Sequence, residues 1–135
     1  MDDTSENYPR VSVKAVFLWR NKVLLYKTQN GTIDIPGGGI KFGETFFEAL
    51  KRELDEEIGF KLREEPQIIH VWSYVSRSRI AHGVYIVYLI KIKKQKDFTS
   101  REFPGIQFFW VDEKKIRQMK LLPEMEKLLL KALSS

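Results

Sequence analysis

Residues 37–60 read GGGIKFGETFFEALKRELDEEIGF, and this stretch decides how the rest of the chain is arranged. A glycine-rich loop is followed by a segment in which Glu53, Glu56 and Glu57 stand at i, i+3 and i+4. A helix of 3.6 residues per turn brings these three carboxylates to one face, where they repel one another. A cation between them removes that repulsion, and such oxygen ligands suit Mg²⁺ or Mn²⁺ better than Zn²⁺. The stretch therefore predicts a metal-binding helix face.

The bounds of this helix are predicted by the residues at its two ends. Thr45 is placed to cap the N-terminus, with Glu48 three residues later in the capping-box position. Gly59 is placed to end the helix in a left-handed conformation. An apolar stripe lies about a quarter turn from the acidic one. Its members are Phe47, Leu50, Leu54 and Ile58.

The other segments alternate irregularly between strand and helix patterns, which favours a mixed sheet with helices on its faces. Residues 11–19 and 22–27 are expected to form a hairpin. Two helices are expected near the C-terminus, in DEKKIRQM and in PEMEKLLLKAL, with Pro123 in the first turn of the second. Further strands are expected at residues 33–35, 68–75, 82–92 and 108–111.

Length and composition fit one domain. Of the 135 residues 43% are hydrophobic, and we expect a flexible lead-in at 1–9 and a single domain at 10–135. The chain has no cysteine, which excludes disulfides and thiolate metal sites and fits a cytoplasmic location. No apolar run is long enough to span a membrane. The net charge of +5 favours anionic ligands, but no long basic stretch indicates nucleic acid.

The 37–60 stretch resembles the signature of the Nudix hydrolase family. That signature is Gly, five residues, Glu, seven residues, then Arg-Glu-U-x-Glu-Glu-x-Gly-U, where U is a bulky apolar residue. Gly38 begins it here, Glu44 follows, and residues 52–60 complete it, with Phe60 at a position that is usually aliphatic. Chance would match the fixed positions on the order of once in 10⁸ placements. The resemblance implies an α/β fold, a Nudix-like α/β/α sandwich with a mixed sheet.

The resemblance also implies a metal site and its ligands. The cofactor would be Mg²⁺, with Mn²⁺ as a substitute, held by Glu53, Glu56 and Glu57. A carbonyl oxygen of Gly37 would supply one more ligand. Glu44 would support the metal site from near the start of the helix, where the helix dipole favours a carboxylate.

The catalytic roles implied by the resemblance fall on three further positions. Arg52 would orient the glutamates by ion pairing. Glu53 is either a third ligand or a proton acceptor. The general base would come from a loop outside the signature, with Glu102 preferred over Asp97 because it lies closer to the strand at 108–111.

Substrate contacts are expected from glycines and arginines. Gly38 and Gly39 would let the backbone approach phosphates, and Arg77 and Arg79 in the loop between two strands are candidates to bind phosphates. Four strand aromatics are candidates to stack on a base, although sheet packing is the commoner role for such residues. They are Trp72, Tyr74, Tyr85 and Tyr88.

The function expected from the resemblance is cleavage of a phosphoanhydride bond in a nucleoside diphosphate linked to another group. A nucleoside triphosphate, including a damaged one, is the preferred substrate, because no proline follows the signature where some ADP-ribose enzymes of the family carry one. The alternative is a non-catalytic nucleotide-binding regulatory module, although such modules generally lose signature glutamates and none is lost here. An mRNA-decapping role is disfavoured by the short chain. The oligomeric state is open, with a homodimer as one option.

Overall fold

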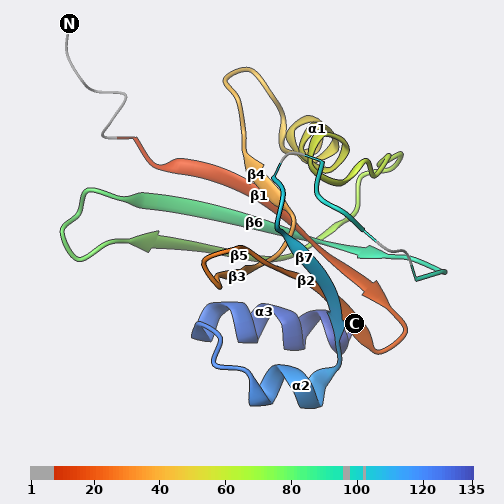
Figure 1. Cartoon of the computed structure of the whole chain (residues 1–135). Coiled ribbons are helices and arrows are strands. Elements are labelled where there is room, and N and C mark those ends of the chain that lie inside the picture. The colour runs from red at the N-terminus through yellow and green to blue at the C-terminus, as the bar shows by residue number, and fades with distance from the viewer. Residues whose placement is uncertain (1–7, 96–97, 102) are drawn as a thin grey trace, which may run out of the picture.

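A mixed sheet with β1 at its centre organises the chain (Figure 1). The computed structural model describes residues 8–95, 98–101 and 103–135, so most of the expected lead-in lies outside the described residues. The elements are β1 (Arg10–Trp19), β2 (Lys22–Lys27), β3 (Ile33–Asp34), β4 (Gly37–Gly39), α1 (Phe46–Ile58), β5 (Gln67–Val75), β6 (His82–Lys91), β7 (Gln107–Val111), α2 (Glu113–Gln118) and α3 (Pro123–Leu133).

The pairing of β1 fixes the order of the sheet. β1 runs parallel to β6, from Arg10 opposite Gly83 to Leu18 opposite Lys91. It runs antiparallel to β2, as the predicted hairpin requires, and antiparallel to β4. The described strands follow the order β3-β2-β1-β6-β5, with β7 paired to β2. Because one pair is parallel and the others are antiparallel, the sheet is mixed, as predicted.

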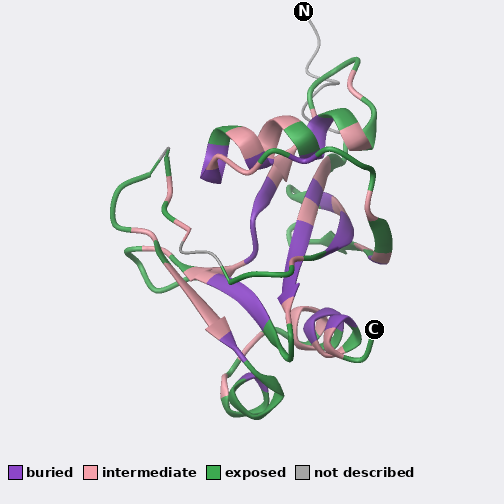
Figure 2. Ribbon diagram, turned by 90° about the vertical axis from the view of Figure 1, so that its right-hand side faces the viewer, coloured by how far each residue is buried: buried purple, intermediate pink, exposed green. Residues whose placement is uncertain are grey.

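Hydrophobic clusters cover the two faces of the sheet, and the buried residues concentrate between the sheet and the helices (Figure 2). Successive residues of a strand point to opposite faces, so Phe17 packs with Leu54 of α1 while Val16 packs with Leu128 of α3. All four of these side chains are fully buried. The α/β/α sandwich is therefore confirmed. Among the helices that the structure describes, none is long and apolar enough to cross a bilayer.

Helix α1 begins and ends where the sequence predicts. The Thr45 side chain accepts a hydrogen bond from the Glu48 N–H, and the Glu48 carboxylate accepts one from the Thr45 N–H at 2.8 Å. Gly59 ends the helix with φ at 69°. The unusual aromatic residue of the signature, Phe60, packs against the core with its ring edge-on to Phe17, at a centroid distance of 4.9 Å.

The glycine run differs from the prediction, because residues 37–39 form the strand β4 and not a loop. Glycine is disfavoured in strands, so the pattern indicated a turn. Here the pairing with β1 excludes a side chain: a Cβ on Gly37, whose φ is 139°, would lie 2.1 Å from the Val13 carbonyl oxygen. Only glycine lets the two strands approach this closely.

Candidate active site

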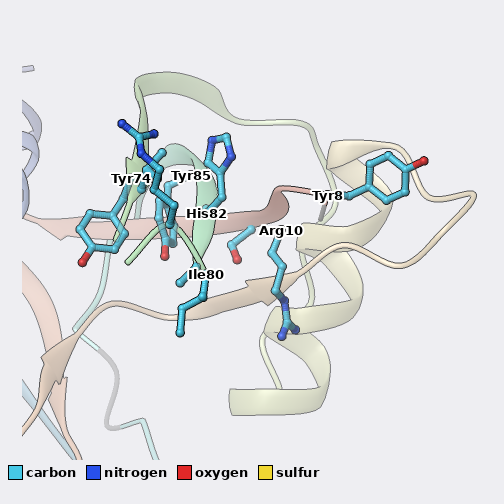
Figure 3. A pocket seen from close by; sticks show the side chains of 11 residues that line it. Tyr8, Arg10, Tyr74, Ile80, His82 and Tyr85 are labelled. Carbon is cyan, nitrogen blue, oxygen red and sulfur yellow. The ribbon is translucent and has the colours of Figure 1, made fainter. Parts of the chain in front are cut away.

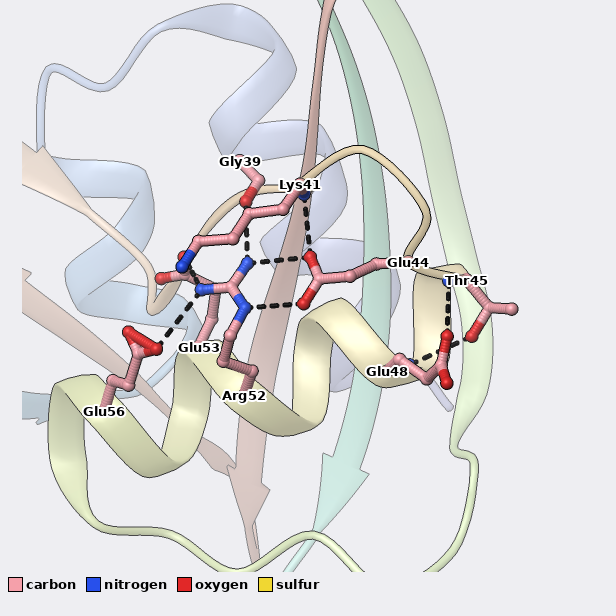
Figure 4. Close-up of polar contacts among 8 residues, drawn as sticks. All are labelled: Gly39, Lys41, Glu44, Thr45, Glu48, Arg52, Glu53 and Glu56. Atoms are coloured by element: carbon pink, nitrogen blue, oxygen red, sulfur yellow. Dashed lines mark hydrogen bonds and ion pairs between the residues drawn. The ribbon is translucent and has the colours of Figure 1, made fainter.

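Arg52 is the centre of the polar network on α1 (Figure 4). Its Nε and Nη2 donate to the two carboxylate oxygens of Glu44, at 2.6 and 2.9 Å. Its Nη1 donates to Glu53 Oε1 at 2.8 Å and lies 3.5 Å from Glu56 Oε1, while Nη2 also donates to the Gly39 carbonyl at 3.1 Å. Bidentate guanidinium–carboxylate pairs are strong and directional. Arg52 therefore links the start of α1, its acidic face and the strand β4.

The protonation states of this network are fixed by its hydrogen bonds. Donation from Arg52, and next from the Lys41 backbone N–H at 2.7 Å, lowers the pKa of Glu44 to about 2. The hydrogen bond to Glu44 likewise raises the pKa of the Arg52 guanidinium above its ordinary value. Glu44 and Arg52 therefore both stay charged at neutral pH, and the ion pair beside the acidic face keeps the same charge around that pH.

Gly38 lies directly against the carboxylate of Glu53. A Cβ on Gly38 would be 2.4 Å from Glu53 Oε2 and 2.8 Å from Oε1, both shorter than van der Waals contact. The Glu53 side chain is only 16% exposed and is held from its other side by Arg52. A side chain at position 38 would therefore push this carboxylate out of its place.

Glu57 is the buried member of the acidic face. It is 8% exposed, and the Gly37 N–H makes a long hydrogen bond of 3.4 Å to its Oε1. Burial first, and then the charges of Asp34 and Glu57, raise the pKa of the Tyr26 phenol above its ordinary value. Glu57 thus places a carboxylate in a region near β4 and Tyr26 that is largely closed to solvent, where its negative charge acts more strongly on neighbouring groups.

An open cavity of about 1110 Å³ lies where the start of β1 meets the β5–β6 hairpin (Figure 3). Its lining combines the basic side chains of Arg10 and Arg79 with the aromatic rings of Tyr74 and Tyr85. Ser12 also lines it, and Ser12 pairs in register with Gly39 of β4. The cavity therefore adjoins the glycine strand that faces the acidic helix.

Comparison with known proteins decides the family. The NUDIX domain family matches residues 8–132, nearly the whole chain. The chain belongs to the Nudix hydrolase family.

Two curated relatives are each 33% identical to this chain. The ADP-ribose pyrophosphatase of Methanocaldococcus jannaschii aligns over 105 residues, which are 71% of this chain and 62% of that protein. The nucleoside triphosphatase NudI of Enterobacter sp. (strain 638) aligns over 97 residues, 64% of this chain and 66% of the relative. The alignments thus span slightly less than two thirds of each relative's length.

Solved Nudix structures share the fold. MutT NUDIX hydrolase from Burkholderia pseudomallei superposes with a TM-score of 0.76 at 24% identity, covering 92% of this chain and 98% of that one. The NUDIX domain of Shewanella oneidensis NrtR, in complex with ADP ribose, gives a TM-score of 0.73 at 20% identity, covering 99% and 92%. At these identities the likeness shows the fold alone.

The carboxylate oxygens on the Nudix helix α1 are the type of ligand that hard divalent cations bind. Glu53, Glu56 and Glu57 all lie on the one helix, and Glu57 is held against β4. However, in the part of the chain that the structure describes, no three acidic or histidine side chains already converge on one point. Glu53 and Glu56 are turned toward Arg52 instead.

Arg101 is a site residue that the sequence did not reveal. Its backbone N–H donates to the Glu57 carbonyl at 2.8 Å, and its Nη1 donates to the Asp55 carbonyl at 3.1 Å. The last turn of α1 has no basic residue of its own. Arg101 supplies a donor to the Glu57 carbonyl and a second donor to the Asp55 carbonyl, which also accepts from the Gly59 N–H. The two candidate general bases, Asp97 and Glu102, lie outside the described residues.

Only some of the candidate substrate-binding residues lie at the cavity. Arg79, with φ at 59°, lines the cavity, whereas Arg77 is exposed and is not in the lining. Tyr88 is fully buried and cannot stack on a base, and the Trp72 ring stacks on Tyr85 at 4.6 Å. Arg10 was missed because nothing in the sequence around the first strand marks a ligand-facing side chain.

Proposed function

We propose that this protein is a pyrophosphohydrolase that depends on Mg²⁺ or Mn²⁺ and splits a phosphoanhydride bond in a nucleoside diphosphate linked to another group, releasing a nucleoside monophosphate. The observation that carries the proposal is the buried carboxylate of Glu57 beside β4, on the same helix face as Glu53 and Glu56. A helix retains such a cluster of like charges at a cost to its stability, and a bound cation offsets that cost.

The proposed ligands are Glu53, Glu56, Glu57 and a carbonyl oxygen of Gly37, with Glu44 as support behind them. When bound, the cation neutralises the pyrophosphate and lowers the pKa of a water nucleophile. Glu44 acts through Arg52, since both of its carboxylate oxygens accept from that guanidinium.

The proton of the attacking water is assigned to Glu102, with Asp97 as the second choice from the same loop and Glu53 as the alternative on the helix. The support for Glu102 is its neighbour Arg101, whose backbone and side chain both bind the end of α1. The support for Glu53 is that Arg52 and Gly38 fix its carboxylate on the acidic face. A proton acceptor must come within hydrogen-bond distance of the water.

The substrate would bind along β4 and extend into the cavity. Gly38 and Gly39 offer a backbone that phosphates can approach, and Arg79 and Arg10 offer charge to anionic groups. Tyr85 and its neighbours offer flat apolar surface to a base or a sugar. A nucleoside triphosphate, including a damaged one, is the proposed substrate. ADP-ribose is the second candidate, because one 33%-identical relative carries that activity in its name. A cytoplasmic location is proposed from the absence of cysteine.

The experiment is a substrate panel assayed with Mg²⁺, with Mn²⁺ and with a chelator. The panel contains nucleoside triphosphates, dinucleoside polyphosphates, nucleotide sugars and ADP-ribose, and release of a nucleoside monophosphate is measured. We expect turnover of at least one compound, and none with the chelator. A folded protein that turns over no compound with metal present contradicts the proposal. If calorimetry then shows nucleotide binding without turnover, the non-catalytic regulatory module is the correct reading.

A further inference from the structure

The cavity between β1 and the β5–β6 hairpin is lined by positive charge without any negative charge. Arg10 and Arg79 both line it, and none of its described lining residues is an aspartate or a glutamate, although the chain holds 18 of these. Both arginines are exposed, and neither forms an ion pair with another residue that the structure describes. Guanidinium groups bind phosphate oxygens through two parallel hydrogen bonds. The cavity is therefore suited to an anionic group, and no carboxylate of its lining competes with that group.

The turn between β5 and β6 places Arg79 beside the cavity. The Ser76 N–H donates to the Ala81 carbonyl at 2.8 Å, and the Arg79 N–H donates to the Ser76 carbonyl at 2.9 Å. With these bonds in place Arg79 has a φ of 59°, a left-handed conformation that residues with a Cβ seldom adopt. Backbone strain of this kind is concentrated at ligand-binding sites. Arg77 belongs to the same turn but does not line the cavity.

Tyr85 lies flat over its own strand, close to Arg10. One face of its ring stacks on Trp72, with the ring centroids 4.6 Å apart. A Cβ on Gly83 would be only 2.9 Å from the Tyr85 hydroxyl oxygen, so the ring lies over Gly83. Gly83 pairs in register with Arg10 of the neighbouring strand β1. The hydroxyl of Tyr85 therefore lies at the level of Arg10 in the sheet, and it can donate a hydrogen bond to an anion that Arg10 binds.

These groups lie well away from the proposed metal site. Gly37 pairs with Lys14, which is four residues along β1 from Arg10, a separation of about 13 Å at the rise of a strand. Arg79 is farther still, because its turn lies beyond His82, where the pairing of β5 with β6 ends. The two phosphates of one anhydride are much closer together than this. A substrate whose anhydride lies at Gly37 therefore meets the arginines with a different part, and the charge of the cavity selects an anionic part.

We propose that the cavity binds a phosphomonoester on the ribose of the nucleotide, in addition to the diphosphate at the metal site, an inference that rests on the proposed function. The ribose joins the diphosphate to the base, so a phosphate on its 2′ or 3′ oxygen reaches Arg10 and Arg79 while the base lies on Tyr85 (Figure 3). Such a phosphate carries nearly two negative charges at neutral pH, which match two guanidinium groups. The cavity volume of about 1110 Å³ has room for the nucleoside and this phosphate together.

Isothermal titration calorimetry with Mg²⁺ present compares AMP with adenosine 2′,5′-bisphosphate and adenosine 3′,5′-bisphosphate, which differ from AMP only by the added phosphate. We expect one bisphosphate to bind at least about tenfold more tightly than AMP, the effect of one charge-assisted hydrogen bond. Arg10→Gln and Arg79→Gln should each remove most of this preference. The control Arg77→Gln removes an arginine of the same turn outside the cavity and should keep it. Equal affinities for the three nucleotides, or an equal loss in Arg77→Gln, overturn the proposal.

Turnover separates this inference from the proposed function. ADP-ribose is assayed with and without a phosphate at the position that calorimetry selects. We expect kcat/KM to be at least about tenfold higher with the phosphate, through a lower KM, because this contact adds binding away from the reacting bond. Selective bisphosphate binding with no turnover of any compound contradicts the proposed function and supports the phosphate site. Turnover of both compounds with equal kcat/KM overturns the phosphate site and leaves the proposed function intact.

Discussion

Gly37 and Gly38 are neighbours on β4, yet each stands against a different glutamate and excludes a side chain for a different reason. A Cβ on Gly38 would meet the movable end of the Glu53 side chain. A Cβ on Gly37 would meet the backbone of β1, at Val13 O and Lys14 Cα. Gly38 thus makes room for a functional carboxylate, whereas Gly37 lets the sheet close and donates its N–H toward Glu57. The missing side chain of Gly38 serves the proposed chemistry, whereas the missing side chain of Gly37 serves the fold, beside the carbonyl oxygen that Gly37 offers to the proposed metal site.

The largest expected effect is the loss of turnover when Glu57, the glutamate beside Gly37, is changed. Glu57→Gln keeps the shape of the side chain but removes its charge, so we expect kcat to fall more than about 100-fold. This loss is larger than the usual loss of activity when a residue that only supports a metal ligand is changed. Steady-state kinetics and Mn²⁺ titration measure turnover and metal affinity. Glu113→Gln, an exposed glutamate on α2, is the matched control and should keep full activity. Near wild-type turnover of Glu57→Gln would remove this residue from the metal site.

The next effect separates the two glycines. Gly38→Ala should fold with nearly wild-type stability, because the Glu53 side chain can rotate away, and should lose up to about 100-fold in kcat, because a misplaced functional group is costly. Gly37→Ala should lower the free energy of unfolding by about 3 kcal/mol, since neither the Val13 carbonyl nor the φ of 139° can adapt cheaply. Urea unfolding beside kinetics measures both. Equal destabilisation by the two substitutions would show that the distinction is wrong.

The smallest effect concerns the pH dependence of the network at Glu44. Its pKa is lowered from 4.5 to about 2, so its contribution to stability is fully present above pH 4.5 and is lost as the pH falls toward 2. Glu44→Gln cannot make this contribution at any pH. The difference in unfolding free energy between wild type and Glu44→Gln, measured in urea, should therefore shrink from pH 5 to pH 2. A difference that stays constant over this range would contradict the role of the Glu44 charge.

Local pattern predicted a large part of the fold. Helix α1 is bounded by Thr45 and Gly59 because caps are made by residues one turn away, and such short-range contacts are visible in sequence. The mixed sheet and its covering helices followed from alternating periodicities. The glycine strand β4 was predicted as a loop, since its pairing depends on Lys14 and Ser12, more than twenty residues away.

By itself the sequence determined the family signature, the bounds of its helix and the kind of oxygen donors that the helix carries. Only the tertiary structure decided which of those donors is buried, that Arg52 binds Glu44 and Glu53 together, and that Arg101 holds the end of α1. It also decided that β5 ends the sheet and that Arg79 faces a cavity while Arg77 does not. The physical reason is that these properties arise from the packing of segments distant along the chain, whereas sequence patterns report only the few residues within a turn or a strand of each other.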